Sequence, residues 1–294
     1  MCKHGNCGHV ALDSEIPFRS RRKNVNRKIK IDESIYNDKS IPRKIDLRSE
    51  QSTVKSQGQR GSCTYFVMTS LLESLIIQKQ KTEIDISEEY FAWASKVKNR
   101  LRLREEDSSI AVNASTVQKF GFMLEKNLKY QGSWFDQGMP CELQKDKKLI
   151  DPVCYSHTGP IAEDKRKIIN GSKFIFKAVA SGSADVIYTM AHLKSPITAS
   201  IRAHPMTWKI SSETGHLVLT EEHKKECISK VAKCSAHAVL IVGYDLDKKV
   251  FHFKNSWGAK WGDKGYGTIP FNYMDQMSVR KFMTGTLTKK LKLG

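Results

Sequence analysis

The sequence lacks any apolar stretch long enough to cross a membrane, and its first residues, MCKHGNCGHV, have no apolar core of the signal-peptide type. It also contains no internal repeat and no low-complexity tract apart from a basic arm near the N-terminus. These absences exclude a helical membrane protein and a repeat protein. They remain compatible with an export signal that was removed earlier.

Acidic residues are scarce. The chain of 294 residues has 31 aspartates and glutamates against 49 lysines and arginines, a net charge of +18. The surface is therefore positive at neutral pH, which favours attraction to anionic surfaces. Excess lysine commonly forms a solvated face, so we expect no nucleic-acid partner. With 39% hydrophobic residues the chain can bury a sizeable core, and we expect a globular monomer.

No cysteine occurs between Cys63 and Cys141, and the seven cysteines are unevenly spaced. Six of them form three close pairs, 2/7, 141/154 and 227/234, whereas Cys63 stands alone. Six cysteines allow 15 pairings, so these three disulfides are a hypothesis drawn from proximity. Disulfides would imply secretion or another oxidising compartment. The alternative is a cytosolic protein with seven reduced thiols.

Residues 1–40 differ from the rest of the chain. The stretch FRSRRKNVNRKIK is basic with little apolar periodicity, and YNDKSIP supplies turn residues. We expect an N-terminal extension that serves as a mobile arm, a pro-segment or a partner-binding strip. Its first residues follow the pattern C-x-H-x2-C-x-H, all zinc-ligand types, but a terminal disulfide or a disordered tip is favoured and no metal site is expected. Residues 41–294 would form the main domain.

The first half of that domain has helical patterns and the second half has strand patterns. Apolar residues recur at three- and four-residue intervals from Tyr65 to Ile76, after the cap residues Gly61 and Ser62. Further helices are expected from Ser87 in ISEEYFAWASKV and within STVQKFGFML. The segments SPITASI, TGHLVL, SAHAVLIVGYD and KVFHFKNSW are typical of strands. The fold class is therefore α+β, with a helical part over about residues 50–150 and a β-rich part over about 160–290.

The stretch QGQRGSCTYF places Cys63 in the first turn of the first expected helix. The helix dipole there stabilises a thiolate and lowers the pKa of the thiol. A thiolate nucleophile also needs a base and donors for the oxyanion that it creates. Nine histidines are present, and His237 alone has a clear geometric partner.

That partner comes from a predicted hairpin in SAHAVLIVGYDLDKKVFHFKNSWG, with strands 237–244 and 248–255 around the turn 245–247. If Tyr244 faces Lys248, His237 faces Asn255. Opposed residues have Cβ atoms about 4.5–5.5 Å apart, so the asparagine oxygen would accept the imidazole proton and orient the ring. Trp257 would shield this bond. The set is a catalytic triad with sulfur as the nucleophile.

These motifs, in this order, resemble the papain-like cysteine proteases, the cathepsin family, over about residues 41–285. The segment IPRKIDLR is similar to the start of the mature enzyme, QSTVKSQGQRGSC to the nucleophile loop, and ISEEY to the next helix start. SAHAVLIVGYD is similar to the histidine strand and NSWGAKWGDKGYGTI to the asparagine strand. The resemblance implies a helical left subdomain and a β-barrel-like right subdomain, with substrate in the cleft between them.

The resemblance further implies hydrolysis of peptide bonds in a peptide or protein substrate, without a cofactor and in a secreted enzyme, for example a bacterial one. The expected catalytic residues are the nucleophile Cys63, the acid/base His237, the orienting Asn255 and the oxyanion donor Gln57, which would act beside the Cys63 backbone N–H. The expected substrate-contacting residues are Gly61, Ser62, Asp107, Ser108, Ser109, Trp257 and Trp261. Alternatives are another thiol acyl transfer, such as deamidation, deconjugation or transpeptidation, and a binding protein with a blocked cleft.

The chain departs from the family pattern in three places. Arg60 and Thr64 replace a cysteine and an aromatic residue of the usual nucleophile motif. The family's disulfide from position 60 is therefore absent at both ends, which indicates a divergent branch that holds this loop by packing and hydrogen bonds. Cys63 and His237 are also 174 residues apart (237 − 63), against about 130–150 in such enzymes. We expect an insertion in 129–174 or 213–234 that restricts access to the cleft.

Overall fold

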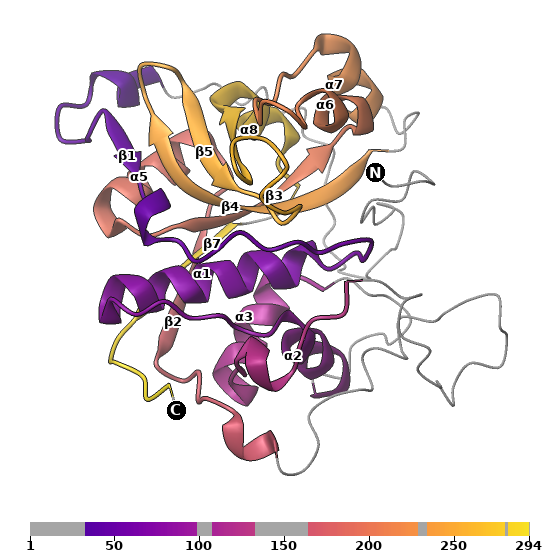
Figure 1. Ribbon diagram of the computed structural model, residues 1–294. Helices are drawn as coiled ribbons and strands as arrows, with labels where there is room; N and C mark the ends of the chain where they lie inside the picture. The colour runs from indigo at the N-terminus through magenta and orange to yellow at the C-terminus, as the bar shows by residue number, and fades with distance from the viewer. Residues whose placement is uncertain (1–32, 99–107, 133–163, 229–233, 280–281, 294) are drawn as a thin grey trace, which may run out of the picture.

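The structure is a computed structural model that describes residues 33–98, 108–132, 164–228, 234–279 and 282–293. Figure 1 shows a layer of helices lying against one side of an antiparallel sheet, with further helices on the other side of that sheet. This arrangement confirms the α+β class. The C-terminal strand and the N-terminal strand both join the sheet, so the two halves of the chain are interleaved.

Three helices form the first layer: α1 (Cys63–Gln80), α2 (Glu88–Trp93) and α3 (Ile110–Phe120). The side chain of Ser87 accepts a hydrogen bond from the backbone N–H of Tyr90, as its cap-like position predicted. The third predicted helix, within 115–124, is displaced. It begins at Ile110 and ends where Gly121 takes a φ of 71°, a left-handed value that favours glycine.

Short helical turns connect these elements. They are η1 (Glu33–Asn37), η2 (Arg48–Glu50), the π-helical turn η3 (Ala94–Lys98), η4 (Glu125–Asn127) and η5 (Asp164–Lys167). The β-rich half also carries four helices among its described residues, which are α5 (Ser183–Leu193), α6 (Pro205–Ile210), α7 (Glu221–Ile228) and α8 (Phe271–Met277).

The sheet has seven strands: β1 (Lys44–Asp46), β2 (Phe174–Val179), β3 (Ile197–Ala203), β4 (Ser235–Asp245), β5 (Val250–Lys254), β6 (Tyr266–Pro270) and β7 (Phe282–Leu287). Their order is β2-β7-β3-β4-β5-β6, and β1 pairs with the end of β4. Within the described residues the strands at the two ends of this order, β2 and β6, do not pair with each other. The sheet is therefore open, which corrects the barrel-like closure expected for this half.

One predicted strand, TGHLVL at 214–219, does not form. His216 makes only an isolated bridge to Thr268, and the Leu217 N–H donates to the Thr268 carbonyl over 3.0 Å. Gly215, with a φ of 73°, turns the backbone immediately before this contact. Leu217 fills the core from this loop, so the apolar pattern reflects burial without a regular strand.

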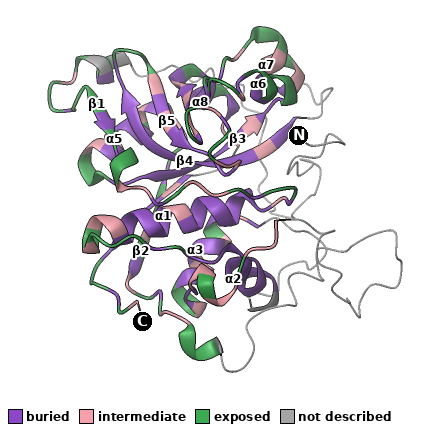
Figure 2. Cartoon of the chain, in the orientation of Figure 1, coloured by how far each residue is buried: buried purple, intermediate pink, exposed green. Residues whose placement is uncertain are grey.

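Strand β4 separates two cores, which explains its nearly continuous apolar sequence. Alternate residues such as Val239 and Ile241 pack with the helices above the sheet, whereas Ala238, Leu240 and Val242 pack against α1. Figure 2 shows α1 and β4 buried along most of their length. A helix that is buried along most of its length belongs between two layers, and α1 lies between β4 and α3.

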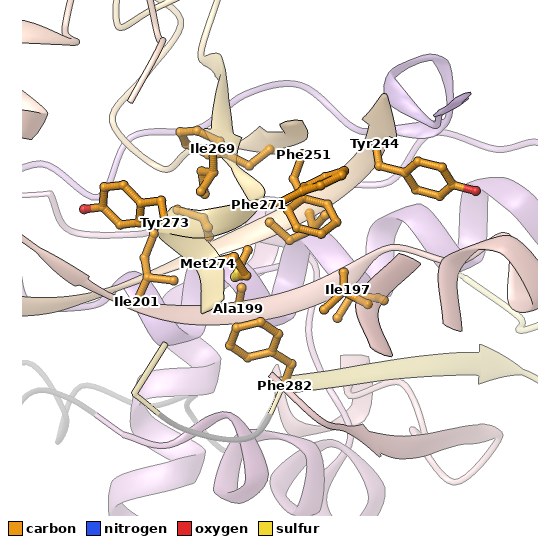
Figure 3. Close-up of a cluster of buried hydrophobic side chains, with 14 of the residues drawn as sticks. Ile197, Ala199, Ile201, Tyr244, Phe251, Ile269, Phe271, Tyr273, Met274 and Phe282 are labelled. Atoms are coloured by element: carbon orange, nitrogen blue, oxygen red, sulfur yellow. The ribbon is translucent and has the colours of Figure 1, made fainter. Parts of the chain in front are cut away.

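The core above the sheet brings together side chains from widely separated strands (Figure 3). Ile197, Ala199 and Ile201 of β3 face Phe271 and other residues of α8, β5 and β6. Ile35 of η1 belongs to the same core and is 1% exposed. The last part of the predicted extension, 33–40, is thus packed on the domain, and its residues 1–32 lie outside the described part of the chain.

Candidate active site

Cys63 is the first residue of α1, and its side chain is buried. Ser62 occupies the N-cap position, but its hydroxyl does not cap the helix and instead lies 2.6 Å from the Tyr130 hydroxyl. Ser62 is therefore the cap residue by position, as predicted, and its hydroxyl is used for another contact. The helix dipole still gives this end of α1 a positive potential, which favours a thiolate at Cys63.

Gln57 connects the nucleophile loop to the asparagine segment. Its Oε1 accepts a hydrogen bond from Ser256 Oγ over 2.6 Å, and its backbone N–H donates to the Ser256 carbonyl over 2.8 Å. Its Nε2 donates to the Arg60 carbonyl over 2.7 Å. An amide NH2 group has two protons, so the second can donate to a substrate oxyanion. Gln57 is 1% exposed, and its side chain is held at both the oxygen and the nitrogen of its amide.

His237 and Asn255 form the predicted pair. His237 Nε2 lies 2.8 Å from Asn255 Oδ1, and both side chains are buried. Asn255 Oδ1 also accepts the backbone N–H of Ser256 over 2.8 Å. Because this oxygen can only accept, Nε2 carries the proton and Nδ1 becomes the basic nitrogen of the neutral ring. The Asn255 Nδ2 is buried with no hydrogen-bond partner among the described residues.

The strand register that led to this pair is wrong. Tyr244 pairs with Phe251 instead of Lys248, and the turn spans 246–249, with Lys249 at a φ of 53°. A register shift between Ile241 and Gly243 then adds one residue to β4. Asn255 therefore lies just beyond the end of β5, and its side chain reaches His237 from there.

Three tryptophans surround His237. The ring of Trp257 lies 4.8 Å from the imidazole and that of Trp208 lies 5.0 Å away, edge to face. Trp261 stacks on Trp208 at 6.0 Å. Trp257 therefore packs on His237 together with Trp208, and a role in shielding the His–Asn bond stays a prediction. Trp208 was not recognised in the sequence, because PMTWKI has no motif that separates it from an ordinary amphipathic turn.

The remaining predicted substrate residues have structural contacts of their own. Ser108 is buried and donates to Asn113 Oδ1 over 2.8 Å, and the Ser109 hydroxyl caps α3 through the Val112 N–H. A substrate role for either serine stays a prediction. Asp107 lies outside the described residues, and Gly61 precedes Ser62 in the nucleophile loop.

One predicted disulfide is present. Cys227, in α7, is bonded to Cys234, which directly precedes β4. The pairs 2/7 and 141/154 lie outside the described residues, as does the N-terminal cysteine and histidine pattern. Across the described ranges, no group of three or more histidine, cysteine or acidic side chains could hold a metal ion.

Buried charges join α1, α2 and β5 behind the nucleophile loop. Lys254 donates to the Ser52 carbonyl over 2.7 Å, and the Ser52 hydroxyl donates to Glu73 over 2.5 Å. Lys55 lies 2.8 Å from Glu73 and 3.0 Å from Glu88. Burial lowers the pKa of Lys254 to about 8 and raises the pKa of Glu88 to about 7, although Lys55 opposes the latter shift.

Comparison with known proteins agrees with this geometry. The sequence model of the papain family of cysteine proteases matches residues 41–286. The chain belongs to the papain family of cysteine proteases. It is therefore a hydrolase of the peptidase class, and papain-family proteases act on peptide or protein substrates.

Relatives of this papain-family chain include an uncharacterized peptidase C1-like protein of Acanthamoeba polyphaga mimivirus, 24% identical over 85% of this chain and 73% of the relative. A cathepsin L-like protein of Caenorhabditis elegans is 26% identical over 90% of this chain and 71% of its own. Two solved structures have similar folds. Xylellain of Xylella fastidiosa has a TM-score of 0.65 and 20% identity, and the match covers 87% of this chain and 90% of that one. A digestive procathepsin L 3 of Tenebrio molitor has a TM-score of 0.58 and 19% identity, and the match covers 96% of this chain and 77% of that one.

Within the described ranges, none of the helices combines the length and the apolar character needed to pass through a membrane.

Proposed function

We propose that this protein is a cysteine peptidase in which a Cys63 thiolate attacks the peptide carbonyl and His237 serves as the acid and base. The observation that carries this proposal is the bond between His237 Nε2 and Asn255 Oδ1, which is tied through Ser256 to Gln57 in the nucleophile loop. This chain of contacts connects the base, its orienting group and a potential oxyanion donor. A buried structural histidine would need neither an orienting group nor an oxyanion donor.

In the proposed mechanism the Cys63 sulfur forms a bond to the substrate carbonyl carbon, and the carbonyl oxygen becomes an oxyanion. The second Nε2 proton of Gln57 and the Cys63 backbone N–H would stabilise this charge. The imidazolium of His237 then gives its proton to the leaving amine, and a thioester remains on Cys63. His237 next takes a proton from water, the water oxygen attacks the thioester, and the acid product leaves.

The proposed substrate contacts are those of the residues flanking the site, Gly61, Ser62, Asp107, Ser108, Ser109, Trp257 and Trp261. Trp257 would lie on the leaving-group side, because it packs against His237. The proposal takes residues 41–294 as the peptidase domain and residues 1–40 as its extension. An oxidising compartment is proposed as well, and the Cys227–Cys234 disulfide supports it.

The test is hydrolysis of a fluorogenic peptide library by the wild type, Cys63→Ala and Gln57→Ala. We expect no hydrolysis by Cys63→Ala, and a kcat about 10²–10³-fold lower for Gln57→Ala because one oxyanion donor is lost. If the wild type cleaves no peptide yet transfers acyl groups from amide or isopeptide substrates, the alternative acyl-transfer function is correct. Equal kcat values for the wild type and Cys63→Ala would refute both.

A further inference from the structure

Arg60, which replaces the cysteine of the family motif, has a fully buried side chain. It is 1% exposed, and a buried guanidinium is tolerated only with compensating partners. Its Nη1 lies 2.6 Å from Glu89 Oε2 and donates to the Gln131 carbonyl over 2.8 Å. The guanidinium carbon also lies 4.8 Å from the ring centroid of Tyr130. Arg60 therefore has anionic, carbonyl and aromatic partners in the interior.

Glu89 connects Arg60 to two other segments. It stands in the first turn of α2, is 1% exposed, and its Oε2 also accepts the backbone N–H of Gln131 over 3.1 Å. The Gln59 N–H donates to the Gly132 carbonyl over 3.1 Å. A Cβ on Gly58 would lie 2.2 Å from that carbonyl oxygen, so only glycine permits this approach. The nucleophile loop, α2 and residues 130–132 are thus held together without a covalent bond.

Tyr130 extends these contacts to Gln57 and to Ser62, the residue before Cys63. Its hydroxyl donates to the Gln57 carbonyl over 2.9 Å and lies 2.6 Å from the hydroxyl of Ser62, the residue before the Cys63 N–H. Its ring packs edge to face on Phe66 of α1 at 4.8 Å. Arg60 itself accepts the Gln57 Nε2 proton at its backbone carbonyl.

We propose that Arg60, Glu89 and Tyr130 are positioning residues that set the oxyanion donors Gln57 Nε2 and Cys63 N–H, in place of the disulfide of the family motif. The proposal rests on the proposed peptidase function. Gln57 Nε2 donates directly to the Arg60 carbonyl. The Cys63 N–H follows Ser62, whose hydroxyl lies next to the hydroxyl of Tyr130. A displacement of a donor by about 1 Å lowers kcat by as much as about 10²-fold. Substrate affinity would change little, because the oxyanion exists only in the transition state.

The test compares two reactions of the same sulfur. Peptide hydrolysis forms an oxyanion, whereas alkylation by iodoacetamide does not, since the Cys63 thiolate displaces iodide from a methylene carbon. The variants are Tyr130→Phe, which removes one hydroxyl, and the double variant Arg60→Met/Glu89→Gln, which removes the ion pair without leaving a buried charge. Asp275→Ala, which breaks a buried cap of α5 far along the chain, is the matched control for lost stability.

We expect kcat for peptides to fall about 10- to 100-fold in Tyr130→Phe and in the double variant, with KM within about threefold of the wild type. The rate of Cys63 alkylation and its pH profile, followed by mass spectrometry, should stay unchanged in the variants, and Asp275→Ala should keep both rates. Arg60→Lys should retain only part of the wild-type kcat, because lysine lacks the planar fork of the arginine guanidinium.

A kcat within about twofold of the wild type in both folded variants overturns the proposal, as does an equal loss of hydrolysis and alkylation. If the double variant does not fold, Tyr130→Phe decides alone. Failure of the underlying peptidase function gives a different result: the wild type itself then alkylates at Cys63 but hydrolyses no peptide.

Discussion

At the scale of single residues, Asn255 has the most defined chemical task. Its Oδ1 accepts hydrogen bonds from His237 Nε2 and from the Ser256 N–H, each over 2.8 Å. The second bond fixes the amide, and the amide in turn selects the histidine tautomer. Trp208 and Trp257 pack on the imidazole, and a hydrogen bond in such apolar surroundings is stronger than one in water.

We predict that Asn255→Ala lowers kcat about 10- to 100-fold. The lost hydrogen bond to an imidazolium contributes roughly 1.5–3 kcal/mol, and each 1.36 kcal/mol corresponds to a factor of ten. Iodoacetamide alkylation of Cys63 should slow as well, because the imidazolium that pairs with the thiolate is no longer oriented. This parallel loss separates Asn255 from the Arg60 cluster. An unchanged kcat would show that Asn255 does not orient the base.

The catalytic candidates could be predicted from sequence because their motifs combine residue type with position. Cys63 starts a helix, His237 lies in β4, and Asn255 directly follows the adjacent strand β5. Tyr130 and Trp208 could not be predicted from the sequence, because a lone aromatic residue in a loop or a short helix has no distinctive pattern. For Arg60 the sequence indicates only that a cysteine is replaced. Its buried ion pair could not be predicted, because the partner Glu89 is 29 positions away along the chain.

At the scale of elements, the hairpin β4–β5 shows where sequence reasoning fails. The strands were predicted nearly at their observed bounds, because β-branched and aromatic residues mark them. Their register depends on the turn at 246–249 and on the irregularity at Ile241 and Gly243, which no residue pattern specified. The glycine at 243 also lets β1 approach, since a Cβ there would lie 2.3 Å from the Ile45 carbonyl oxygen.

The disulfide between α7 and the start of β4 allows a prediction for this element. Closing a loop with a sequence separation of 7 removes unfolded-state entropy equivalent to about 2–3 kcal/mol. The double variant Cys227→Ala/Cys234→Ala should lose about this much free energy of unfolding in urea. Reductant should destabilise the wild type similarly and leave the double variant unaffected. Equal stability of both proteins under oxidising conditions would contradict the prediction.

At the scale of the whole molecule, buried charges connect the helical layer to the sheet. Lys254 of β5 donates a hydrogen bond to the Ser52 hydroxyl, which donates to Glu73 of α1. Lys55 forms ion pairs with both Glu73 and Glu88 of α2. Glu88 Oε1 accepts from Lys55 and Thr69, whereas its Oε2 is buried with no hydrogen-bond partner in the described part of the chain. The raised pKa means that Glu88 holds a proton below about pH 7, and Oε2 is the oxygen that can carry it because Oε1 already accepts two hydrogen bonds.

This carboxyl makes stability dependent on pH. The pKa of Glu88 is raised by burial from 4.5 to about 7, so between these values the folded protein holds a proton that the unfolded chain has lost. Its contribution to stability is therefore complete below pH 4.5 and is lost as the pH rises through 7. We predict that the free energy of unfolding falls from pH 5 to pH 8 by on the order of 1–3 kcal/mol more in the wild type than in Glu88→Gln. Parallel profiles for the two proteins would contradict this.

Active-site labelling can identify Cys63 as the nucleophile of a cysteine peptidase. The folded, reduced protein is incubated with a peptidyl epoxide, and the adduct is located by mass spectrometry, with Cys63→Ala and Asn255→Ala beside it. We predict one adduct, on Cys63, formed more slowly in Asn255→Ala and absent in Cys63→Ala, with peptide hydrolysis lost in proportion to labelling. An unmodified Cys63, or full hydrolysis after complete labelling, would contradict it.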